Sequence, residues 1–421
     1  MPDMASGWRP RRRLWAMAVV AALVMVAGLA VPAMGSRADD GKPELDHGMR
    51  AWSQTWQAAP QKPQQAGFAD QTLRMIVHTS IGGERVRIRL SNTFGAAPVL
   101  LDGAFVGLLG SGASISGRNV RLTFGGSPGV TLPEGGDVVS DPADLTVPAL
   151  ADLAVSLYLP RDTGPPTGHA DFGNAHQTSY IASGDHAAAA AGTAFTGQTR
   201  AWFFLSGVSV PSRRAAAVVT LGDSITDGTG SSTDTNSRYP DALARRLAAR
   251  PQPLRLGVGN AGIGGNELLR TSACCGASPS VLARLDRDVL AQDGVRSVIL
   301  LAGINDIGGD HHADAASLIA GVQQVATQLR AHGIRVLGGT ITPSYGRPGP
   351  YGTQQTEDVR QQVNAWVRTA DAFDAVVDFD QALRDPEDPR RLRAGYDSGD
   401  HLHPSDAGYQ AMAEAVPLDQ L

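Results

Sequence analysis

The sequence contains very little cysteine and lysine. Two cysteines among 421 residues cannot form the disulfide framework of a small cysteine-rich domain. Lysine occurs only at Lys42 and Lys62, so arginine carries nearly all of the positive charge. The formal net charge of −5 argues against nucleic acid as the main partner. A hydrophobic fraction of 42% excludes a disordered chain, and the length predicts two domains.

One long apolar run lies near the N-terminus. It covers residues 14–30, follows a cluster of arginines and precedes small residues up to Gly35. This order predicts a secretory signal peptide over residues 1–35 and an exported mature protein. The alternative is an uncleaved anchor, which would bring the protein into contact with a membrane. The run is slightly shorter than the roughly 20 residues that span a bilayer comfortably.

Residues 36–205 contain short runs with a period of two. Arginine alternates with aliphatic residues over 85–90, and aliphatic residues occupy every second position over 153–159. Gly, Pro, Ser and Asp separate these runs, which is typical of strands joined by turns. The pattern predicts an antiparallel β-sandwich domain over 36–205. Residues 206–215, which include Pro211, are predicted to form a linker.

The period changes in residues 216–421. Apolar runs typical of buried strands alternate with helical segments, which predicts βαβ units and a parallel sheet. The predicted strands are 216–221, 254–258, 297–302, 334–338 and 375–379. The predicted helices are 240–249, 280–291, 314–331, 354–370 and 405–415. Ligands of such sheets bind beyond the carboxyl ends of the strands, so motifs at those ends are candidates for a site.

Three of these strand ends lead into motifs with chemically useful groups. The first strand runs into Gly222-Asp223-Ser224, the second into a glycine block ending at Gly265, and the third into a segment with Asn305. A serine at such a turn can act as a nucleophile, and amides can donate to an oxyanion. Each motif alone has a simpler interpretation, namely a helix cap, a tight turn and an Asx turn. The glycine block lacks the dinucleotide-binding pattern, so it predicts no nucleotide cofactor.

A loop near the C-terminus carries a carboxylate and an imidazole three residues apart. On a turn, Asp400 can reach one ring nitrogen of His403 and leave the other free, while Pro404 keeps His403 extended. The alternative is a metal site, because Asp400, His401 and His403 together offer three ligands. The Asp-His-His segment at 310–312 would have to supply further ligands to such a site.

In this order, the four motifs resemble the SGNH, or GDSL-type, hydrolase family, which is named for a Ser, a Gly, an Asn and a His in separate blocks. The resemblance covers about residues 216–417. It implies a three-layer, flavodoxin-like α/β domain over 216–421 and a serine esterase or lipase. It also implies that no metal or other cofactor takes part.

The resemblance also implies a role for each matching residue. Ser224 would be the nucleophile, His403 the general base and then acid, and Asp400 the carboxylate that orients His403. The oxyanion hole would comprise the backbone N–H groups of Ser224 and Gly265 and the side-chain amide of Asn305. Within the glycine block, the adjacent Gly264 is the alternative to Gly265.

These motifs define the reaction more closely than they define the substrate. The family hydrolyses lipids, acyl thioesters and acetylated sugars. The absence of a long apolar segment after residue 216 favours short-chain acyl or acetyl esters, including esters on extracellular carbohydrate. A lipase or phospholipase is the nearest alternative. A non-catalytic carbohydrate-binding protein on an inactive hydrolase scaffold is the alternative of another class, although the intact motifs argue against it.

Several other residues have two interpretations each. Tryptophans of the β domain either bind carbohydrate or belong to its core, and the core is the commoner place for them: Trp52, Trp56 and Trp202. Aromatic residues and histidines in two loops either line the acyl or alcohol site or face solvent: Tyr345, Tyr351, His311 and His312. The adjacent Cys274 and Cys275 either form a vicinal disulfide or remain two thiols, because no third cysteine exists.

Overall fold

The computed structural model describes residues 51–62, 65–170, 174–212, 216–251, 255–272, 278–309 and 311–421. Residues Arg50–Leu421 form one compact unit. The predicted signal peptide at 1–35 and the Cys274–Cys275 pair lie outside the described residues. Within the described part of the chain, no helix is both long and apolar enough to cross a membrane.

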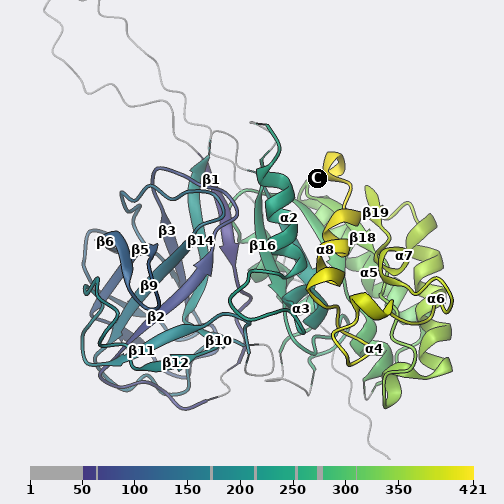
Figure 1. The fold of residues 1–421 in the computed structure, drawn as a ribbon, viewed down its shortest axis with the longest axis horizontal. Helices are drawn as coiled ribbons and strands as arrows, with labels where there is room; N and C mark the ends of the chain where they lie inside the picture. The colour runs from purple at the N-terminus through teal and green to yellow at the C-terminus, as the bar shows by residue number, and fades with distance from the viewer. Residues whose placement is uncertain are drawn as a thin grey trace, which may run out of the picture. The chain divides into compact units, whose positions relative to one another are not determined.

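The N-terminal part of this unit is rich in antiparallel strands (Figure 1). One sheet has the strand order β1 (Ala51–Gln57), β14 (Leu205–Ser212), β3 (Arg87–Ser91) and β8 (Asp137–Val139). A larger sheet has the order β12 (Gly197–Thr199), β11 (Ser179–Ser183), β2 (Gln71–His78), β9 (Asp152–Leu159), β5 (Gly103–Leu109) and β6 (Ile115–Arg121). This part also contains two separate two-stranded sheets. They pair β4 (Val99–Leu101) with β7 (Val130–Leu132) and β10 (Gly168–His169) with β13 (Trp202–Phe203).

Both larger sheets contribute side chains to one hydrophobic core. Ile88 of β3 and Met75 of β2 are buried in the same cluster. The cluster also contains Trp56 and Trp202, whose ring centroids lie 5.1 Å apart. The indole N–H of Trp202 donates to the carbonyl of Ile76 at 2.7 Å. These two tryptophans are therefore core residues, as the commoner interpretation has it.

The segment predicted as a linker is largely a strand. Residues Leu205–Ser212 form β14, which pairs with β1 on one side and β3 on the other. The prediction of a linker over 206–215 is wrong for these residues. Pro211 suggested a break, but it lies near the end of the strand, where the loss of one N–H donor is tolerated.

The C-terminal part is built on a five-stranded parallel sheet. Its order is β16 (Gly257–Gly262), β15 (Ala217–Gly222), β17 (Val295–Leu301), β18 (Arg335–Gly339) and β19 (Ala375–Val377). Every residue of β15 is buried, because a parallel sheet is covered on both faces. The strand order 2-1-3-4-5 is that of flavodoxin-like folds, so the predicted parallel α/β architecture is confirmed.

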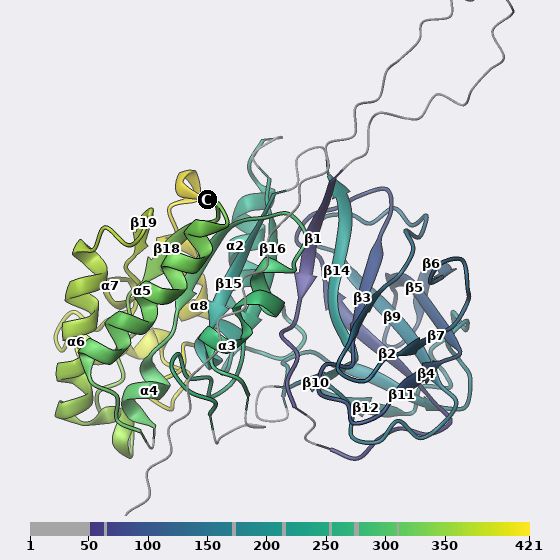
Figure 2. The same ribbon diagram turned by 180° about the vertical axis from the view of Figure 1, so that it is seen from behind.

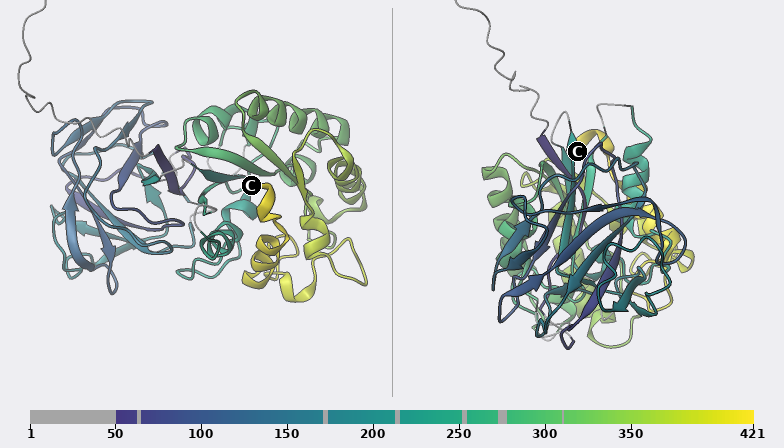
Figure 3. Two further views of the ribbon diagram at one scale, coloured as in Figure 1. Left: turned by 90° about the horizontal axis from the view of Figure 1, so that it is seen from above. Right: turned by 90° about the vertical axis from the view of Figure 1, so that its left-hand side faces the viewer.

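Helices cover the two faces of this sheet (Figure 3). Figure 1 looks onto the face with α2 (Tyr239–Ala248), α7 (Phe379–Leu383) and α8 (Asp406–Ala415). Figure 2 looks onto the opposite face, with α3 (Val281–Leu285), α5 (Ala315–Ala331) and α6 (Gln354–Thr369). Two short helices, α1 (Ser224–Asp227) and α4 (Ile304–Gly308), directly follow β15 and β17.

Strand β16 begins later than the sequence suggests and includes part of the glycine block. A side chain at Gly257 would collide with the backbone carbonyl of Gln54 in β1, which packs against this edge strand. Glycine is normally unfavourable inside a strand, which is why the segment after residue 258 was predicted as a loop. Here the close approach of another strand requires it.

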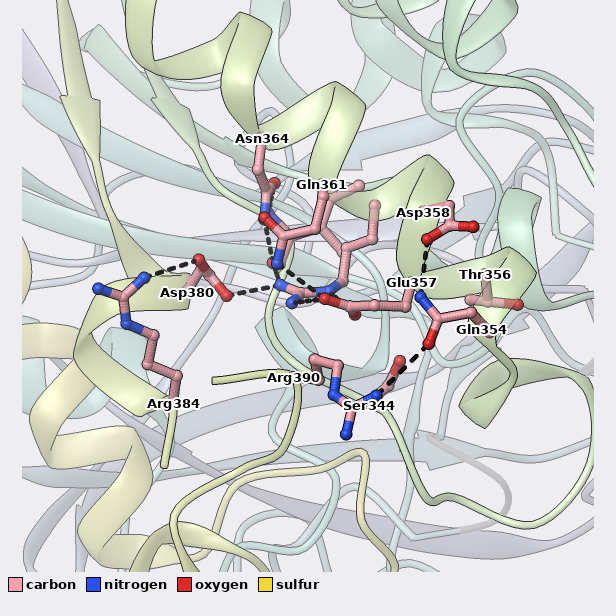
Figure 4. Close-up of polar contacts among 12 residues, drawn as sticks. Ser344, Gln354, Thr356, Glu357, Asp358, Gln361, Asn364, Asp380, Arg384 and Arg390 are labelled. Atoms are coloured by element: carbon pink, nitrogen blue, oxygen red, sulfur yellow. Dashed lines mark hydrogen bonds and ion pairs between the residues drawn. The ribbon is translucent and has the colours of Figure 1, made fainter. Parts of the chain in front are cut away.

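A buried ion network holds α6 near the start of the loop after β18. Arg360 pairs with Glu357 at 2.7 Å and with Asp380 at 2.6 Å, and its guanidinium donates to the carbonyl of Ile341. Asn364 accepts from the N–H of Ile341 and donates to the Ile341 carbonyl. Figure 4 shows how Glu357, Asn364 and Asp380 converge around this point. The network therefore fixes residue 341, from which the chain runs to the candidate site.

Candidate active site

The candidate nucleophile lies where β15 turns into α1. Asp223 caps this helix by accepting from the N–H of Ile225 at 3.0 Å, and Ser224 is the first helical residue. A side chain at Gly222 would collide with the carbonyl of Leu301 and with Thr226. Only glycine fits at this turn, which places the Ser224 hydroxyl at the carboxyl end of the sheet.

The structure brings Ser224, His403 and Asp400 into one hydrogen-bonded chain. Ser224 Oγ lies 2.9 Å from His403 Nε2, and His403 Nδ1 lies 2.7 Å from Asp400 Oδ2. The N–H groups of Leu402 and His403 donate to Asp400 Oδ1 at 3.0 and 2.8 Å. These bonds fix the carboxylate within its own turn, so the imidazole can take only a narrow range of orientations.

The charge state of Asp400 sets the direction of these bonds. Burial alone would raise the pKa of Asp400, but hydrogen bonds from the His403 side chain and from the N–H groups of Leu402 and His403 together hold it well below its usual range. Arg347 adds an ion pair to Asp400 Oδ2 at 2.9 Å. An ionised carboxylate only accepts, so His403 Nδ1 carries the proton and Nε2 is left to accept from Ser224.

Asn305 and Gly265 lie in the same pocket as Ser224 and His403. The pocket has a volume of about 200 Å³. Asn305 Nδ2 donates to the carbonyl of Asn266 at 3.0 Å, and Tyr351 donates to Asn305 Oδ1 at 3.1 Å. These two bonds orient the amide and leave its second N–H available for a ligand. Gly265 has a φ of 66°, a left-handed conformation that favours glycine.

Three positioning contacts in this region have no signal in the sequence motifs. Arg347 and Tyr351 come from the loop after β18 and contact Asp400 and Asn305, respectively. Asp306 accepts from the N–H groups of Leu268 and Leu269 and so fixes the end of the glycine block. Asp306 stands in the predicted motif beside Asn305, but its partners lie 38 and 37 residues away.

The side chain of Arg284 connects the carboxyl ends of β15 and β16. This fully buried side chain of α3 donates to the carbonyls of Gly222 and Ala261 at 2.8 Å each. It also donates to Asn266 Oδ1 at 3.0 Å. The ends of β15 and β16 are therefore held at a constant separation. Segment 280–291 contains two arginines and two aspartates, so the sequence did not single out Arg284 for this role.

The residues of the alternative metal site do not converge in the described part of the chain. His401 is exposed and pairs with Asp397 at 2.6 Å, whereas both ring nitrogens of His403 face Ser224 and Asp400. No group of three or more metal-ligating side chains occurs among the described residues. Asp310 lies outside them.

Of the four aromatic and histidine residues predicted either to line the site or to face solvent, two line the pocket and two do not. Tyr351 and His311 line the pocket with Ser224. Tyr345 instead stacks under the guanidinium of Arg390 at 4.0 Å, and the ring of His312 contacts the carbonyl of Ile307. The structure therefore brings one residue of each loop to the candidate site.

The carboxyl group of Asp223 makes stability depend on pH. Burial raises the pKa of Asp223 to about 7, although the N–H of Ile225 and the charges of His403 and Arg284 act in the opposite direction. In the unfolded chain the pKa is about 3.9, so the folded protein binds this proton more tightly. The contribution of Asp223 to stability is therefore greatest below about pH 4 and decreases as the pH rises to about 7.

We expect Asp223→Asn to raise the free energy of unfolding at pH 8 by about 1–3 kcal/mol and to change it little at pH 4. Asparagine keeps the acceptor that caps α1 and removes the charge. Urea unfolding across this pH range measures the difference. Asp371→Asn, at an exposed position, is the control and should show no such trend. An equal effect of Asp223→Asn at both pH values would contradict the expectation.

The chain is similar to known proteins over about half of its length. Similar solved structures include a GDSL-like lipase from Bacteroides thetaiotaomicron VPI-5482 (19% identity, TM-score 0.38, 50% of this chain and 90% of that chain). They also include a lipase/acylhydrolase from Enterococcus faecalis (20%, 0.37, 48% and 92%) and a carbohydrate acetylesterase from Sinorhizobium meliloti (15%, 0.37, 48% and 95%). The comparison with curated proteins gave no match. Residues 220–411 match the sequence profile of the GDSL-like lipase/acylhydrolase family.

Proposed function

We propose that the protein is a secreted serine hydrolase of carboxylic esters that works through an acyl-enzyme. The observation that carries the proposal is the chain Ser224–His403–Asp400, which opens into a pocket shared with Asn305 and Gly265. The match of residues 220–411 to the profile of the GDSL-like lipase/acylhydrolase family supports it.

The mechanism follows from the proton positions. A neutral serine hydroxyl is a poor nucleophile, so His403 Nε2 takes its proton as Ser224 Oγ attacks the ester carbonyl. Asp400 stabilises the imidazolium that forms. The N–H groups of Ser224 and Gly265 and the amide of Asn305 donate to the developing oxyanion. His403 then protonates the leaving alcohol, and water repeats the attack on the acyl-enzyme with His403 again as base.

The pocket supports short substrates. Its volume of about 200 Å³ is below the roughly 300–1,000 Å³ of pockets that enclose drug-sized ligands. Several lining side chains are polar or charged, among them Glu267, His311 and Arg347. We therefore propose short-chain acyl or acetyl esters as substrates, including acetyl esters of extracellular carbohydrate. A lipase or phospholipase remains the second candidate, because the same catalytic groups would serve it.

A fluorophosphonate probe tests the proposed nucleophile directly. Such probes form a covalent bond with an activated serine, so we expect labelling of Ser224, identified by peptide mass analysis. A non-catalytic binding protein on the same scaffold would remain unlabelled. A chain-length series of soluble esters, measured beside acetylated polysaccharide and phospholipid vesicles, then separates the substrate classes. Preference for long acyl chains or vesicles would favour the lipase.

Secretion has its own test. Full-length protein produced in an export-competent bacterium should appear in the culture fluid with a mature N-terminus near residue 36. The intact mass of the purified protein measures the cut. Recovery of the uncut chain in the membrane fraction would instead support an anchor.

We expect Asn305→Ala to lower kcat by about 10²- to 10³-fold with a much smaller change in KM. The amide contacts the oxyanion, whose charge develops only in the transition state, and one such donor stabilises it by about 3–4 kcal/mol. Steady-state kinetics on a short-chain aryl ester measure the changes in kcat and in KM separately. Tyr351→Phe removes only the hydroxyl that orients the amide and should have a smaller effect on the same parameter. A rise in KM without loss of kcat would remove Asn305 from the oxyanion hole.

A further inference from the structure

The helix that carries Ser224 is too short to be stable by its own backbone hydrogen bonds. Helix α1 spans only Ser224–Asp227 and is followed by Gly228 with a φ of 118°. Helices this short are not stable in isolation, so contacts with other elements must hold it. Asp227 lies nearly one turn after Ser224 and shares the same short backbone segment. Any group that fixes Asp227 therefore limits the movement of Ser224.

A histidine from the β-rich part makes that contact. His169 of β10 places Nε2 at 3.0 Å from Asp227 Oδ1, and its Nδ1 lies 2.8 Å from the carbonyl of Ala59. Both side chains are only a few per cent exposed. A carbonyl only accepts, so Nδ1 carries a proton, and one further proton must lie between Nε2 and the carboxyl group. The two side chains thus form a buried, hydrogen-bonded pair.

The residues after α1 make further polar contacts with the β-rich part. Asp234 accepts from Gln177 Nε2 at 2.9 Å and from the backbone and side chain of Thr178. Asn236 donates to Asp152 at 3.2 Å, and Arg238 donates to the carbonyl of Ala175. Asp234 and Asn236 have φ values of 62° and 51°, left-handed conformations that these contacts help to hold.

The same segment contacts the sheet and the histidine loop. A side chain at Gly262 of β16 would collide with the backbone of Asp227, so α1 has no room to move toward the sheet. A side chain at Gly230 would lie within 3.0 Å of the Pro404 carbonyl, in the loop that carries His403. Asp406 accepts from the N–H of Ser232 at 2.8 Å. Displacement of residues 227–238 would therefore move Ser224 and His403 relative to each other.

From this geometry we propose that the β-rich part acts as a brace for the catalytic serine, with His169 and Asp227 as positioning residues. The inference rests on the proposed function, since it assumes that Ser224 and His403 act together. The pair does not touch the substrate. It sets the distance between Ser224 Oγ and His403 Nε2, so it affects the rate of acylation rather than the affinity for the ester.

The test compares variants of His169 at a temperature where each is folded. His169→Ala should lower kcat and the rate of fluorophosphonate labelling by about 10- to 100-fold, with KM within about threefold of wild type. His169→Gln, which keeps a side-chain donor, should recover part of the loss. The double variant with Asp227→Asn should be no worse than His169→Ala alone, because both act through one contact. His186→Ala, a histidine elsewhere in the β-rich part, is the matched control and should retain wild-type kcat.

Two outcomes would overturn the proposal. One is a folded His169→Ala variant with wild-type kcat, and the other is an equal loss in the His186→Ala control. Should His169→Ala fail to fold, Asp234→Ala, at an exposed position of the same segment, replaces it, with an expected loss of kcat of about 3- to 10-fold. Wild-type kcat in Asp234→Ala would then overturn it. Failure of the proposed function is separate, since it would appear as full activity in Ser224→Ala.

Discussion

Ser224→Ala is expected to lower kcat on a short-chain aryl ester by about 10⁴- to 10⁶-fold. The hydroxyl is the only group in the proposed mechanism that bonds to the acyl carbon, so its loss removes the acyl-enzyme. The oxyanion donors and the pocket remain, which explains why some residual rate over water is expected. Ser224 Oγ lies 2.9 Å from His403 Nε2, a contact between two site residues, so its loss should change stability little.

The measurement needs three readouts. Steady-state kinetics give the loss of kcat, thermal unfolding shows that the variant is folded, and the fluorophosphonate probe should no longer label it. Ser317→Ala, at an exposed position of α5, is the matched control and should retain activity and labelling. Activity within tenfold of wild type in folded Ser224→Ala would show that another residue is the nucleophile.

Asp400→Asn should lower kcat by about 10⁴-fold. The N–H groups of Leu402 and His403 donate to Oδ1, so the new amide turns its oxygen toward them and its NH₂ toward His403. The ring must then accept at Nδ1 and carry its proton at Nε2. In that tautomer Nε2 can no longer accept the proton of Ser224, so the base is lost although the side-chain shape is kept.

The same variant should also change the pH dependence of stability. The pKa of Asp400 is lowered in the folded protein, so its ionised form stabilises the fold above about pH 4 and this contribution is lost as the pH falls further. Asp400→Asn should therefore destabilise the protein at pH 7 and by a smaller amount at pH 3. Urea unfolding at both pH values checks this. Arg347→Gln, which leaves the carboxylate in place, should lose far less kcat, and an equal loss would assign the effect to the ion pair instead.

Secondary structure in the C-terminal part followed closely from local pattern. The helix expected over 314–331 spans Ala315–Ala331, and the one expected over 354–370 spans Gln354–Thr369. Both have strong apolar periodicity and a side-chain cap, in each case a residue that accepts from the first turn. Local signals of this kind lie within a few residues and can be interpreted without knowledge of the fold.

The residues of the candidate site were found because of a rule about parallel sheets. Ser224, Gly265 and Asn305 each follow a predicted strand, and parallel strands end at the same edge. The structure brings them into one pocket with His403. Asp400 was accessible to the same reasoning, because its spacing from His403 allows a bond within one turn.

The sequence by itself determined the two kinds of sheet, most of the helices, and the order of the four motifs, because each depends on short-range pattern or on chain order. Only the tertiary structure decided that residues 205–212 form a central strand, that Arg347 and Tyr351 contact Asp400 and Asn305, and that His169 holds Asp227. Those contacts join residues 46 to 58 positions apart, and no periodicity relates such residues. They arise from the packing of whole elements, which also explains why glycine was required at position 257.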